Sequence, residues 1–286
     1  MISRNSWRKI IKRIDLHVHS VFSDGTCTVG GLVRAAKRSC VSVMALTDHD
    51  TLDGWKDFRR ECGAFSIVPV SGVELSAMCG RTVHILGYRL ERPEILEKAL
   101  EWVRDRRNAR NVVMLSRLRE NGLEITLDDV TREAKGRVLA RPHFARALVA
   151  KGYVPDIPSA FARYIDRGGT AYVSREGLPP VECVRTIREA GGLPVLAHPS
   201  LTGLDAKGLG ELLETLKEHG LWGLECISSH CSSEAAYGYL SIADKYSLFP
   251  TAGSDFHGSI RPQVELGVQV SDDFLPWARL GVNFCR

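Results

Sequence analysis

The sequence predicts an α/β fold in which strands and helices alternate to form a barrel-like (β/α) array. Short apolar runs that are typical of buried strands alternate with helical patterns along most of the 286 residues. A chain of this length can build one large α/β domain and still carry an insertion. Several of the strand-like runs end in His, Asp or Glu, and strand ends of a (β/α) barrel meet at one mouth. These observations together predict a barrel with a polar site at its mouth.

The first half of the chain supplies most of the predicted barrel elements. Residues 14–16 and 41–47 are apolar runs that predict strands, and the second run ends in an Asp-His-Asp turn. A helix is expected at 29–38 because Thr28 is a suitable N-cap, and a second helix is expected at 52–62. Apolar and β-branched residues predict one or two strands within 66–74 and another at 81–88.

The second half combines a helical insertion with a return to the strand pattern. Strand-like runs recur at 193–198, 223–226 and 249–255. The intervening stretch carries long helical patterns, beginning with an arginine-rich helix at 94–121. We therefore expect the barrel to comprise residues 1–92 and 173–286, with a small helical domain inserted at 93–172. Because strands alternate with helices along the chain, the barrel strands are expected to be parallel.

Composition narrows the function classes. The chain is 44% hydrophobic and 25% charged, with a net charge of +4 and a pI of about 8.6. That weakly basic balance suits an anionic substrate and argues against duplex DNA as a partner. The sequence has neither a membrane-length apolar run nor the apolar core of a signal peptide, which predicts a cytoplasmic protein without membrane contact. The eight cysteines form no C-x-x-C pair and are expected to be reduced, mostly buried thiols.

A metal site is predicted from histidines and carboxylates at the strand ends. His17 and His19 are two residues apart, so a strand places both imidazoles on one face, where they can bind a divalent ion. A surface or core histidine pair is the alternative for this motif alone, and residues 48–50 could be a simple turn. The full set of candidate ligands is His17, His19, Asp24, His49, Glu74, His84, His198, Asp255 and His257. A donor set of this kind without thiolates suits Mn²⁺, Fe²⁺ or Zn²⁺.

Seven motifs in order along the chain carry a resemblance to a known family. They are DLHVHS (15–20), SDG (23–25), LTDHD (46–50), GVE (72–74), HILG (84–87), AHP (197–199) and GSDFH (253–257). This pattern resembles the PHP (polymerase and histidinol phosphatase) family. The resemblance implies a distorted (β/α)7 barrel with a trinuclear metal site, for which Mn²⁺ is the first expectation.

The resemblance also implies how the ligands divide among three sites. One site would use His17, His19, Glu74 and Asp255. A second would share Glu74 as a bridge with His84 and His198. The third would use Asp24, His49 and His257, with Asp24 standing where some family members have histidine, so that two or three ions are expected.

Within the family, the chain resembles phosphoesterases that act on nucleoside 3′,5′-bisphosphates and relatives that trim short RNA from the 5′ end. The resemblance implies that Arg104 and Arg107 grip a substrate phosphate and that Arg141 and His143 form a second substrate-binding segment. Arg can hold a phosphate through two parallel hydrogen bonds. His230 follows a predicted strand and is a weaker candidate contact. A solvated helix face remains the alternative for residues 104–110.

The expected reaction is hydrolysis of the 3′-phosphate of a nucleoside 3′,5′-bisphosphate, such as pAp to AMP, by a metal-bound hydroxide. His198 or His257 would protonate the leaving oxygen, and the sequence does not distinguish between them. Three alternatives stay open: a 5′–3′ exoribonuclease on short 5′-phosphorylated RNA, a small-metabolite phosphatase of the histidinol-phosphate type, and a non-catalytic metal-bound module. The sequence contains no signal for the oligomeric state.

Overall fold

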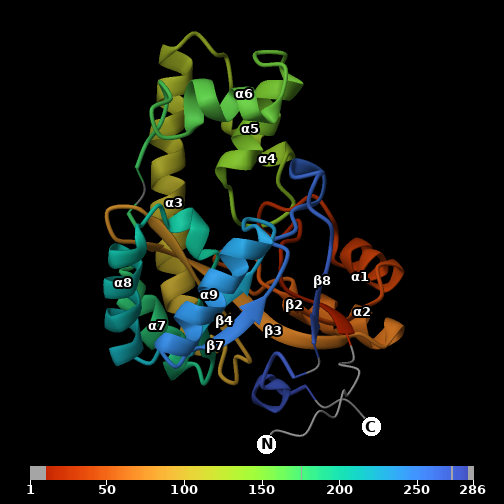
Figure 1. The fold of residues 1–286 in the computed structure, drawn as a ribbon. Coiled ribbons are helices and arrows are strands. Elements are labelled where there is room, and N and C mark those ends of the chain that lie inside the picture. The colour runs from red at the N-terminus through yellow and green to blue at the C-terminus, as the bar shows by residue number, and fades with distance from the viewer. Residues whose placement is uncertain (1–10, 175, 272, 283–286) are drawn as a thin grey trace, which may run out of the picture.

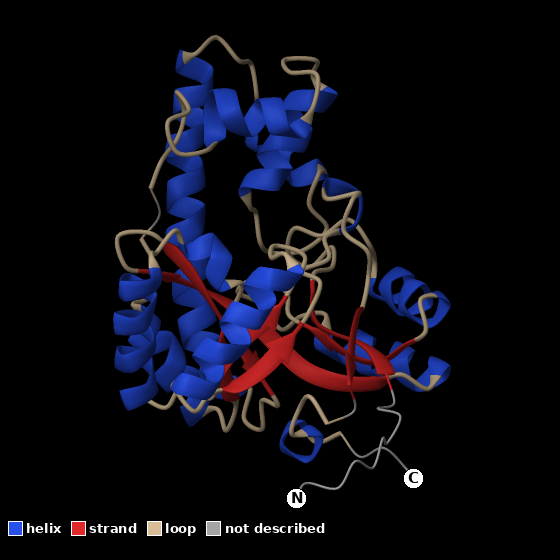
Figure 2. Cartoon of the chain, viewed as in Figure 1, coloured by secondary structure: helices blue, strands red, loops and turns tan. Residues whose placement is uncertain are grey.

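A computed structural model describes residues 11–174, 176–271 and 273–282 of the chain. The strands form a strongly curved sheet in the lower half of the molecule, and helices cover its outer face (Figures 1 and 2). A group of helices stands above one end of the sheet and is joined to it by a long helix (Figure 1).

Within the described residues, the sheet has eight strands in the order β7-β6-β5-β4-β3-β2-β1-β8. The strands are β1 (Ile11–Val18), β2 (Val41–Leu46), β3 (Val68–Met78), β4 (Thr82–Tyr88), β5 (Leu193–Leu196), β6 (Gly223–Ile227), β7 (Phe249–Ala252) and β8 (Val268–Ser271). Strands β1 to β7 follow one another in sequence order around the barrel, which confirms the expected seven-stranded (β/α) arrangement.

Two features of the sheet differ from the expectation of parallel strands. Strand β4 is antiparallel to both β3 and β5, because only residues 79–81 separate β3 from β4 and so short a connection can build only a hairpin. An unpredicted eighth strand, β8, pairs antiparallel with β1. Residues 66–74 contribute a single strand that runs on to Met78, rather than two strands.

The barrel closes where the end of β1 meets the segment that follows β7. The backbone N–H of His19 donates to the carbonyl of Phe256 at 2.9 Å, and Val18 forms an isolated parallel bridge with Phe256. The buried Asp15 carboxylate accepts from the Ser254 amide at 2.8 Å and the Gly267 amide at 2.7 Å. One acidic side chain therefore ties β1 to the segments that follow β7 and precede β8.

Five helices cover the outer face of the barrel. They are α1 (Val29–Arg38), α2 (Trp55–Phe65), α7 (Pro180–Glu189), α8 (Ala206–Glu218) and α9 (Ser233–Lys245). Helix α1 has the predicted bounds, and Thr28 caps it by accepting from the Gly31 amide at 3.2 Å. Helix α2 begins three residues later than predicted. Short helical turns follow at Pro199–Thr202, Gly258–Ile260 and Trp277–Leu280, and the last of these contributes Trp277 and Leu280 to the core inside the barrel.

The inserted segment has a hydrophobic core of its own. It contains α3 (Glu94–Glu120), α4 (Leu127–Arg132), α5 (Arg141–Ala150), α6 (Ile157–Ala160) and a π-helical turn at Phe161–Ile165. Leu96 and Leu100, near the start of α3, pack against the barrel helices, whereas Met114 and Leu118 pack within the insert. The long helix therefore belongs to both cores and connects them.

Two further expectations concern the burial of the cysteines and the presence of membrane-spanning helices. The seven cysteines in the described part of the chain are free thiols, but only Cys62, Cys183 and Cys226 are buried, so the expectation of mostly buried thiols was wrong. The eighth, Cys285, lies outside the described residues. Among the helices that the structure describes, none has both the length and the apolar character needed to cross a membrane.

Gly253 allows the barrel to close, and its replacement tests this packing. A Cβ atom at Gly253 would lie 2.4 Å from Cβ and 2.6 Å from the backbone nitrogen of His17. We expect Gly253→Ala to lower the free energy of unfolding by about 1–3 kcal/mol, because β1 must shift. Urea unfolding of the variant measures this change.

Gly238→Ala is the matched control, because it lies in helix α9 with nothing within 4 Å of the added carbon. It should stabilise the protein by roughly 0.4–1 kcal/mol. A Gly253→Ala variant as stable as the parent protein would contradict this account of the closure.

Candidate active site

The nine predicted metal ligands come together at one end of the barrel. His17 lies near the end of β1, Glu74 lies in β3 and His84 lies in β4. The other six follow strands: His19 and Asp24 follow β1, His49 follows β2, His198 follows β5, and Asp255 and His257 follow β7. All are buried except His84, which is partly exposed.

Glu74 lies at the centre of this group, and its two oxygens face different histidines. Oε2 lies 3.3 Å from His17 Nε2 and 3.1 Å from His19 Nε2. Oδ1 of Asp255 completes this set at 3.4 Å from His17 Nε2 and 3.1 Å from His19 Nε2. These four residues are the set that the family resemblance implies for the first metal site.

The other oxygen of Glu74 faces the second set of histidines. Oε1 lies 2.9 Å from His84 Nδ1 and 3.0 Å from His198 Nε2. His49 forms one candidate ligand group with Glu74 and His84, although its Nδ1 lies 3.0 Å from Oε2, the oxygen that faces the first set. A single carboxylate thus faces both sets of donors, as a bridging ligand requires.

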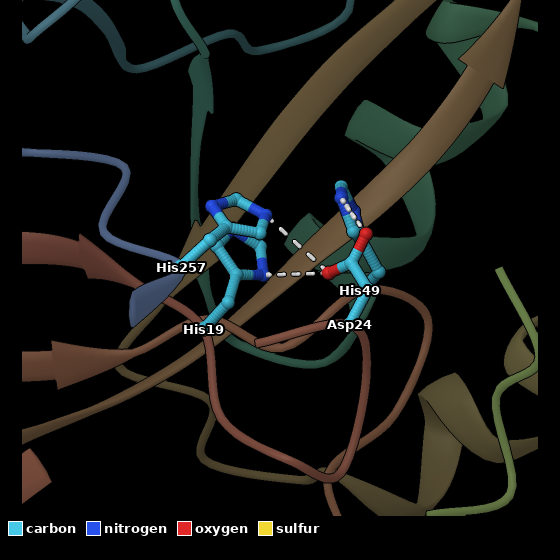
Figure 3. A group of neighbouring side chains, drawn as sticks. All are labelled: His19, Asp24, His49 and His257. Atoms are coloured by element: carbon cyan, nitrogen blue, oxygen red, sulfur yellow. Dashed lines mark ion pairs between the residues drawn. The ribbon is translucent and has the colours of Figure 1, made fainter. Parts of the chain in front are cut away.

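The third set gathers around Asp24 (Figure 3). Asp24 Oδ1 lies 3.3 Å from His257 Nε2 and 3.9 Å from His19 Nδ1. Asp24 Oδ2 lies 3.9 Å from His49 Nε2. The resemblance implied Asp24, His49 and His257 here, and the structure adds His19 to the group.

The donor atoms that face the centre fit divalent ions. In the described part of the chain, six of them are buried and have no hydrogen-bond partner: His17 Nε2, His19 Nε2, Asp24 Oδ1, His49 Nδ1, Glu74 Oε2 and Asp255 Oδ1. Unsatisfied buried polar atoms are costly, so a group of them pointing at one place needs a ligand. Imidazole and carboxylate donors without thiolates suit Mn²⁺, Fe²⁺ and Zn²⁺.

The electrostatics of the protein alone favour cations at this centre. Burial raises the pKa of Glu74, but His49, His84 and His17 more than offset this effect and hold the pKa well below its usual range. Burial lowers the pKa of His17, yet Glu225, Glu74 and Asp255 raise it well above the ordinary value. The carboxylates therefore stay ionised, and a metal ion that binds here displaces protons from histidine.

Backbone strain accompanies this arrangement of ligands. His198 has a φ of 22° and Asp255 a φ of 54°, and Asp50, next to His49, has a φ of 53°. Such values are uncommon for residues other than glycine, and they cluster at functional sites. The backbone therefore has positive φ angles in the turns that carry His198 and Asp255 and next to His49.

A second carboxylate, Glu225, orients two of the predicted ligands and was missed from the sequence. Its Oε1 accepts from His17 Nδ1 at 2.9 Å, and its Oε2 accepts from the His198 amide at 2.7 Å. The first bond leaves Nε2 of His17 free to act as a metal donor. Glu225 lies in an apolar strand with no neighbouring acid or histidine, so no spacing in the sequence marked it.

The second oxygen of Asp255 is held by the side chains of His230 and Arg261. Oδ2 lies 2.6 Å from His230 Nε2 and 2.5 Å from Arg261 Nη1. These contacts direct Oδ1 toward His17 and His19. The predicted candidate His230 thus lies beside the metal centre, with Arg261 next to it.

Asp48 positions the loop that carries His19 and Asp24. Its carboxylate accepts from the Ser20 amide at 2.7 Å and from the Ser23 hydroxyl at 2.5 Å. Both partners belong to the motifs that follow β1. The acidic residue before His49 therefore supports the site without facing it.

A cavity of about 360 Å³ opens above the metal centre and contains several arginines. Asp24, His49 and His257 line its floor, while Arg107 and Arg110 of α3 line it with Arg141 and Arg261. A smaller adjoining cavity of about 170 Å³ reaches Glu74, His198 and Asp255 and shares Arg141 and Arg261. Positive side chains therefore border the space next to the metal ligands.

The predicted substrate contacts Arg104, Arg107 and His143 have partners within the protein. Arg104 donates to the backbone carbonyl of Asp50 at 2.9 Å, and Arg107 pairs with the Asp50 carboxylate. Arg104 is not among the residues that line the cavity. His143 is buried and caps α5, where its Nδ1 accepts from the Ala140 amide at 2.9 Å. Burial lowers the pKa of His143 to about 4, so the ring is neutral.

Comparison with known proteins agrees with this geometry. A family model described as PHP domain matches residues 15–153. The chain is 32% identical to the 5′-3′ exoribonuclease Rnm of Escherichia coli, over 88% of this chain and 87% of that protein. It is also 32% identical to a 3′,5′-nucleoside bisphosphate phosphatase of Chromobacterium violaceum, over 85% of this chain and 87% of the relative.

The fold is also similar to that of a solved structure. The crystal structure of an amidohydrolase from Chromobacterium violaceum with bound sulfate superposes with a TM-score of 0.86 at 30% identity, covering 94% of this chain and 95% of that one. The sequence identity and the fold similarity extend over most of the chain. The protein therefore belongs to the PHP domain family and is a metal-dependent phosphoesterase.

Proposed function

We propose that this enzyme hydrolyses the 3′-phosphate of nucleoside 3′,5′-bisphosphates, such as pAp to AMP. The observation that carries the proposal is the group of arginines beside the metal centre. Arg107, Arg110, Arg141 and Arg261 all line the cavity whose floor carries metal ligands. A substrate with two phosphates can present one to the centre and the other to the arginines.

The proposed metal ligands are the nine residues of the centre, with Glu74 shared between sets. Bound divalent ions, with Mn²⁺ as the first expectation and Fe²⁺ or Zn²⁺ as alternatives, would activate water and neutralise charge on the phosphoryl oxygens. Two or three ions would occupy the three ligand groups. Neither Ser nor Cys is needed as a nucleophile in such a site.

The arginines would orient the substrate through its second phosphate. A guanidinium can hold a phosphate by two parallel hydrogen bonds, which fixes both position and rotation. Fixing the reacting phosphate against the centre in this way lowers the entropic part of the barrier. Arg141 is itself held by Asp166 at 3.0 Å, so its head group is positioned before substrate arrives.

His198 and His257 are the proposed proton donors to the leaving oxygen, but both rings are already engaged. Nε2 of His198 faces Glu74 at 3.0 Å, and Nδ1 of His257 lies 2.9 Å from the Asp255 carbonyl. Both are also proposed ligands, and a ring nitrogen that binds a metal cannot donate a proton. Which histidine donates the proton is therefore determined by which of the three ligand groups holds a metal ion during the reaction.

A 5′–3′ exoribonuclease on short RNA is the second candidate, and the similarity to the Escherichia coli relative favours it. Both activities would use the same centre and the same arginines, so they can coexist. A small-metabolite phosphatase of the histidinol-phosphate type is less well supported, because a substrate with one phosphate has no use for the arginines of the insert.

Parallel assays on three substrates test the proposed function. We expect the Mn²⁺-loaded protein to convert adenosine 3′,5′-bisphosphate to AMP and phosphate faster than it degrades a 5′-phosphorylated RNA trimer or histidinol phosphate. Release of AMP and phosphate is measured by chromatography. Preferential release of monophosphates from the trimer would make the enzyme an exoribonuclease, and activity on histidinol phosphate alone would contradict the role given to the insert.

Replacing Arg141 tests the second phosphate site. Arg141→Ala removes a charge-assisted contact, so KM for adenosine 3′,5′-bisphosphate should rise roughly 10- to 100-fold. The kinetics of 4-nitrophenyl phosphate, which has one phosphate, should not change. Steady-state kinetics on both substrates separate the two effects.

Arg163→Ala is the matched control, because Arg163 is an exposed residue of the π-helical turn and does not line the cavity. It should leave both substrates unaffected. If Arg141→Ala impaired the two substrates equally, the second phosphate site would not exist as proposed.

A further inference from the structure

The cavity above the metal centre has an apolar wall that neither the metal ligands nor the arginines explain. This wall, which we call the insert wall, consists of Pro142, Ile157, Pro158, Phe161, Tyr172 and Val173. Five of these residues lie within the predicted insert at 93–172 and Val173 directly follows it, whereas the lining residues Asp24, His49, His84 and His257 come from the barrel. The cavity therefore combines the ionic side chains of the barrel and of the arginines with an apolar surface.

The insert wall is held rigidly from behind. Ile157, Phe161 and Val173 are partly buried and pack against the hydrophobic core of the insert. Phe161 begins the π-helical turn, a rare geometry that is often found at functional sites. An apolar surface that is already in place can bind a ligand without an ordering cost.

The insert wall is joined to the proposed phosphate site through Arg141. The guanidinium carbon of Arg141 lies 5.8 Å from the centroid of the Phe161 ring, and Asp166, directly after the π-helical turn, binds Arg141 at 3.0 Å. A ligand whose phosphate meets Arg141 would therefore bring its neighbouring groups close to an aromatic ring.

The side chains of the insert wall suit the face of a flat ring rather than its edge. The wall residues named above include no amide and no carboxylate side chain, which are the groups that read the hydrogen-bonding edges of a base. Aromatic side chains instead stack on any base, because every base has a π face. A cavity of about 360 Å³ is within the range of small-molecule sites.

We propose that the insert wall, with Phe161 at its centre, binds the nucleobase of the substrate by stacking and without selecting among bases. This inference rests on the proposed function, since it takes the phosphates to lie at the metal centre and the arginines. It makes the insert the part of the enzyme that distinguishes a nucleotide from a sugar phosphate. Phe161 is then a specificity-determining residue.

Calorimetric binding of three monophosphates to the Mn²⁺-loaded protein tests the proposal without relying on catalysis. AMP and UMP should bind with affinities within about tenfold of each other, and both should bind more tightly than ribose 5-phosphate. Phe161→Ala should weaken AMP and UMP binding roughly 5- to 100-fold and leave ribose 5-phosphate binding unchanged. Tyr237→Ala removes an exposed aromatic ring outside the cavity and should change none of the three.

A second variant guards against a disturbed insert core. Phe161→Leu keeps apolar bulk against the core but removes the ring, so it should retain the parent melting temperature and still lose affinity for AMP and UMP. Equal affinities of the parent protein for AMP and ribose 5-phosphate would overturn the proposal, and so would an equal loss for all three ligands in both variants. Failure of the proposed function would appear differently, as intact AMP binding without hydrolysis of adenosine 3′,5′-bisphosphate.

Discussion

The buried carboxylate of Glu74 is the constraint on which the rest of the site depends. It is fully buried, and its two oxygens lie within 3.3 Å of nitrogens from five histidines: His17, His19, His49, His84 and His198. A buried ionised carboxylate requires hydrogen-bond donors or positive charge close to its oxygens. Every strand end that supplies one of these histidines must therefore reach the same point, and this requirement shapes the mouth of the barrel.

The unusual course of the sheet follows from the same requirement. Strand β3 continues to Met78 and returns as the antiparallel β4, and this hairpin places His84 Nδ1 2.9 Å from Glu74 Oε1. Gly253 lets the segment after β7 approach β1 closely, and Asp255 and His257 follow it into the centre. Departures from a regular barrel are thus concentrated where ligands must converge.

Asp50 couples the insert to the metal centre. It follows the ligand His49, its amide donates to the Glu74 carbonyl at 3.0 Å, and it binds both Arg104 and Arg107 of α3. The arginine-rich helix therefore has a structural role as well as a proposed role in binding phosphate. Arg104 has the structural role through its hydrogen bond to Asp50, whereas Arg107 contacts Asp50 and also lines the cavity.

The sequence predicted that the nine candidate ligands lie together, because each lies in a short motif at a strand end, where type and spacing are both informative. It also predicted α1, α3 and the order of β1 to β7 from local patterns. It could not predict that β4 runs antiparallel, which depends on a three-residue turn, or that β8 pairs with β1 across most of the chain. Glu225 and Arg261 were missed because their contacts at the site arise only from tertiary structure and leave no local signal.

The central claim is that Glu74 joins two groups of ligands into one metal centre, and counting bound metal tests it most directly. Inductively coupled plasma mass spectrometry of the Mn²⁺-loaded, desalted protein should give two or three ions per chain. Glu74→Gln, with folding verified by its melting temperature and circular dichroism, should lose at least two of them, since both ligand groups share this carboxylate. A folded Glu74→Gln variant that retained the metal content of the parent protein would contradict the account.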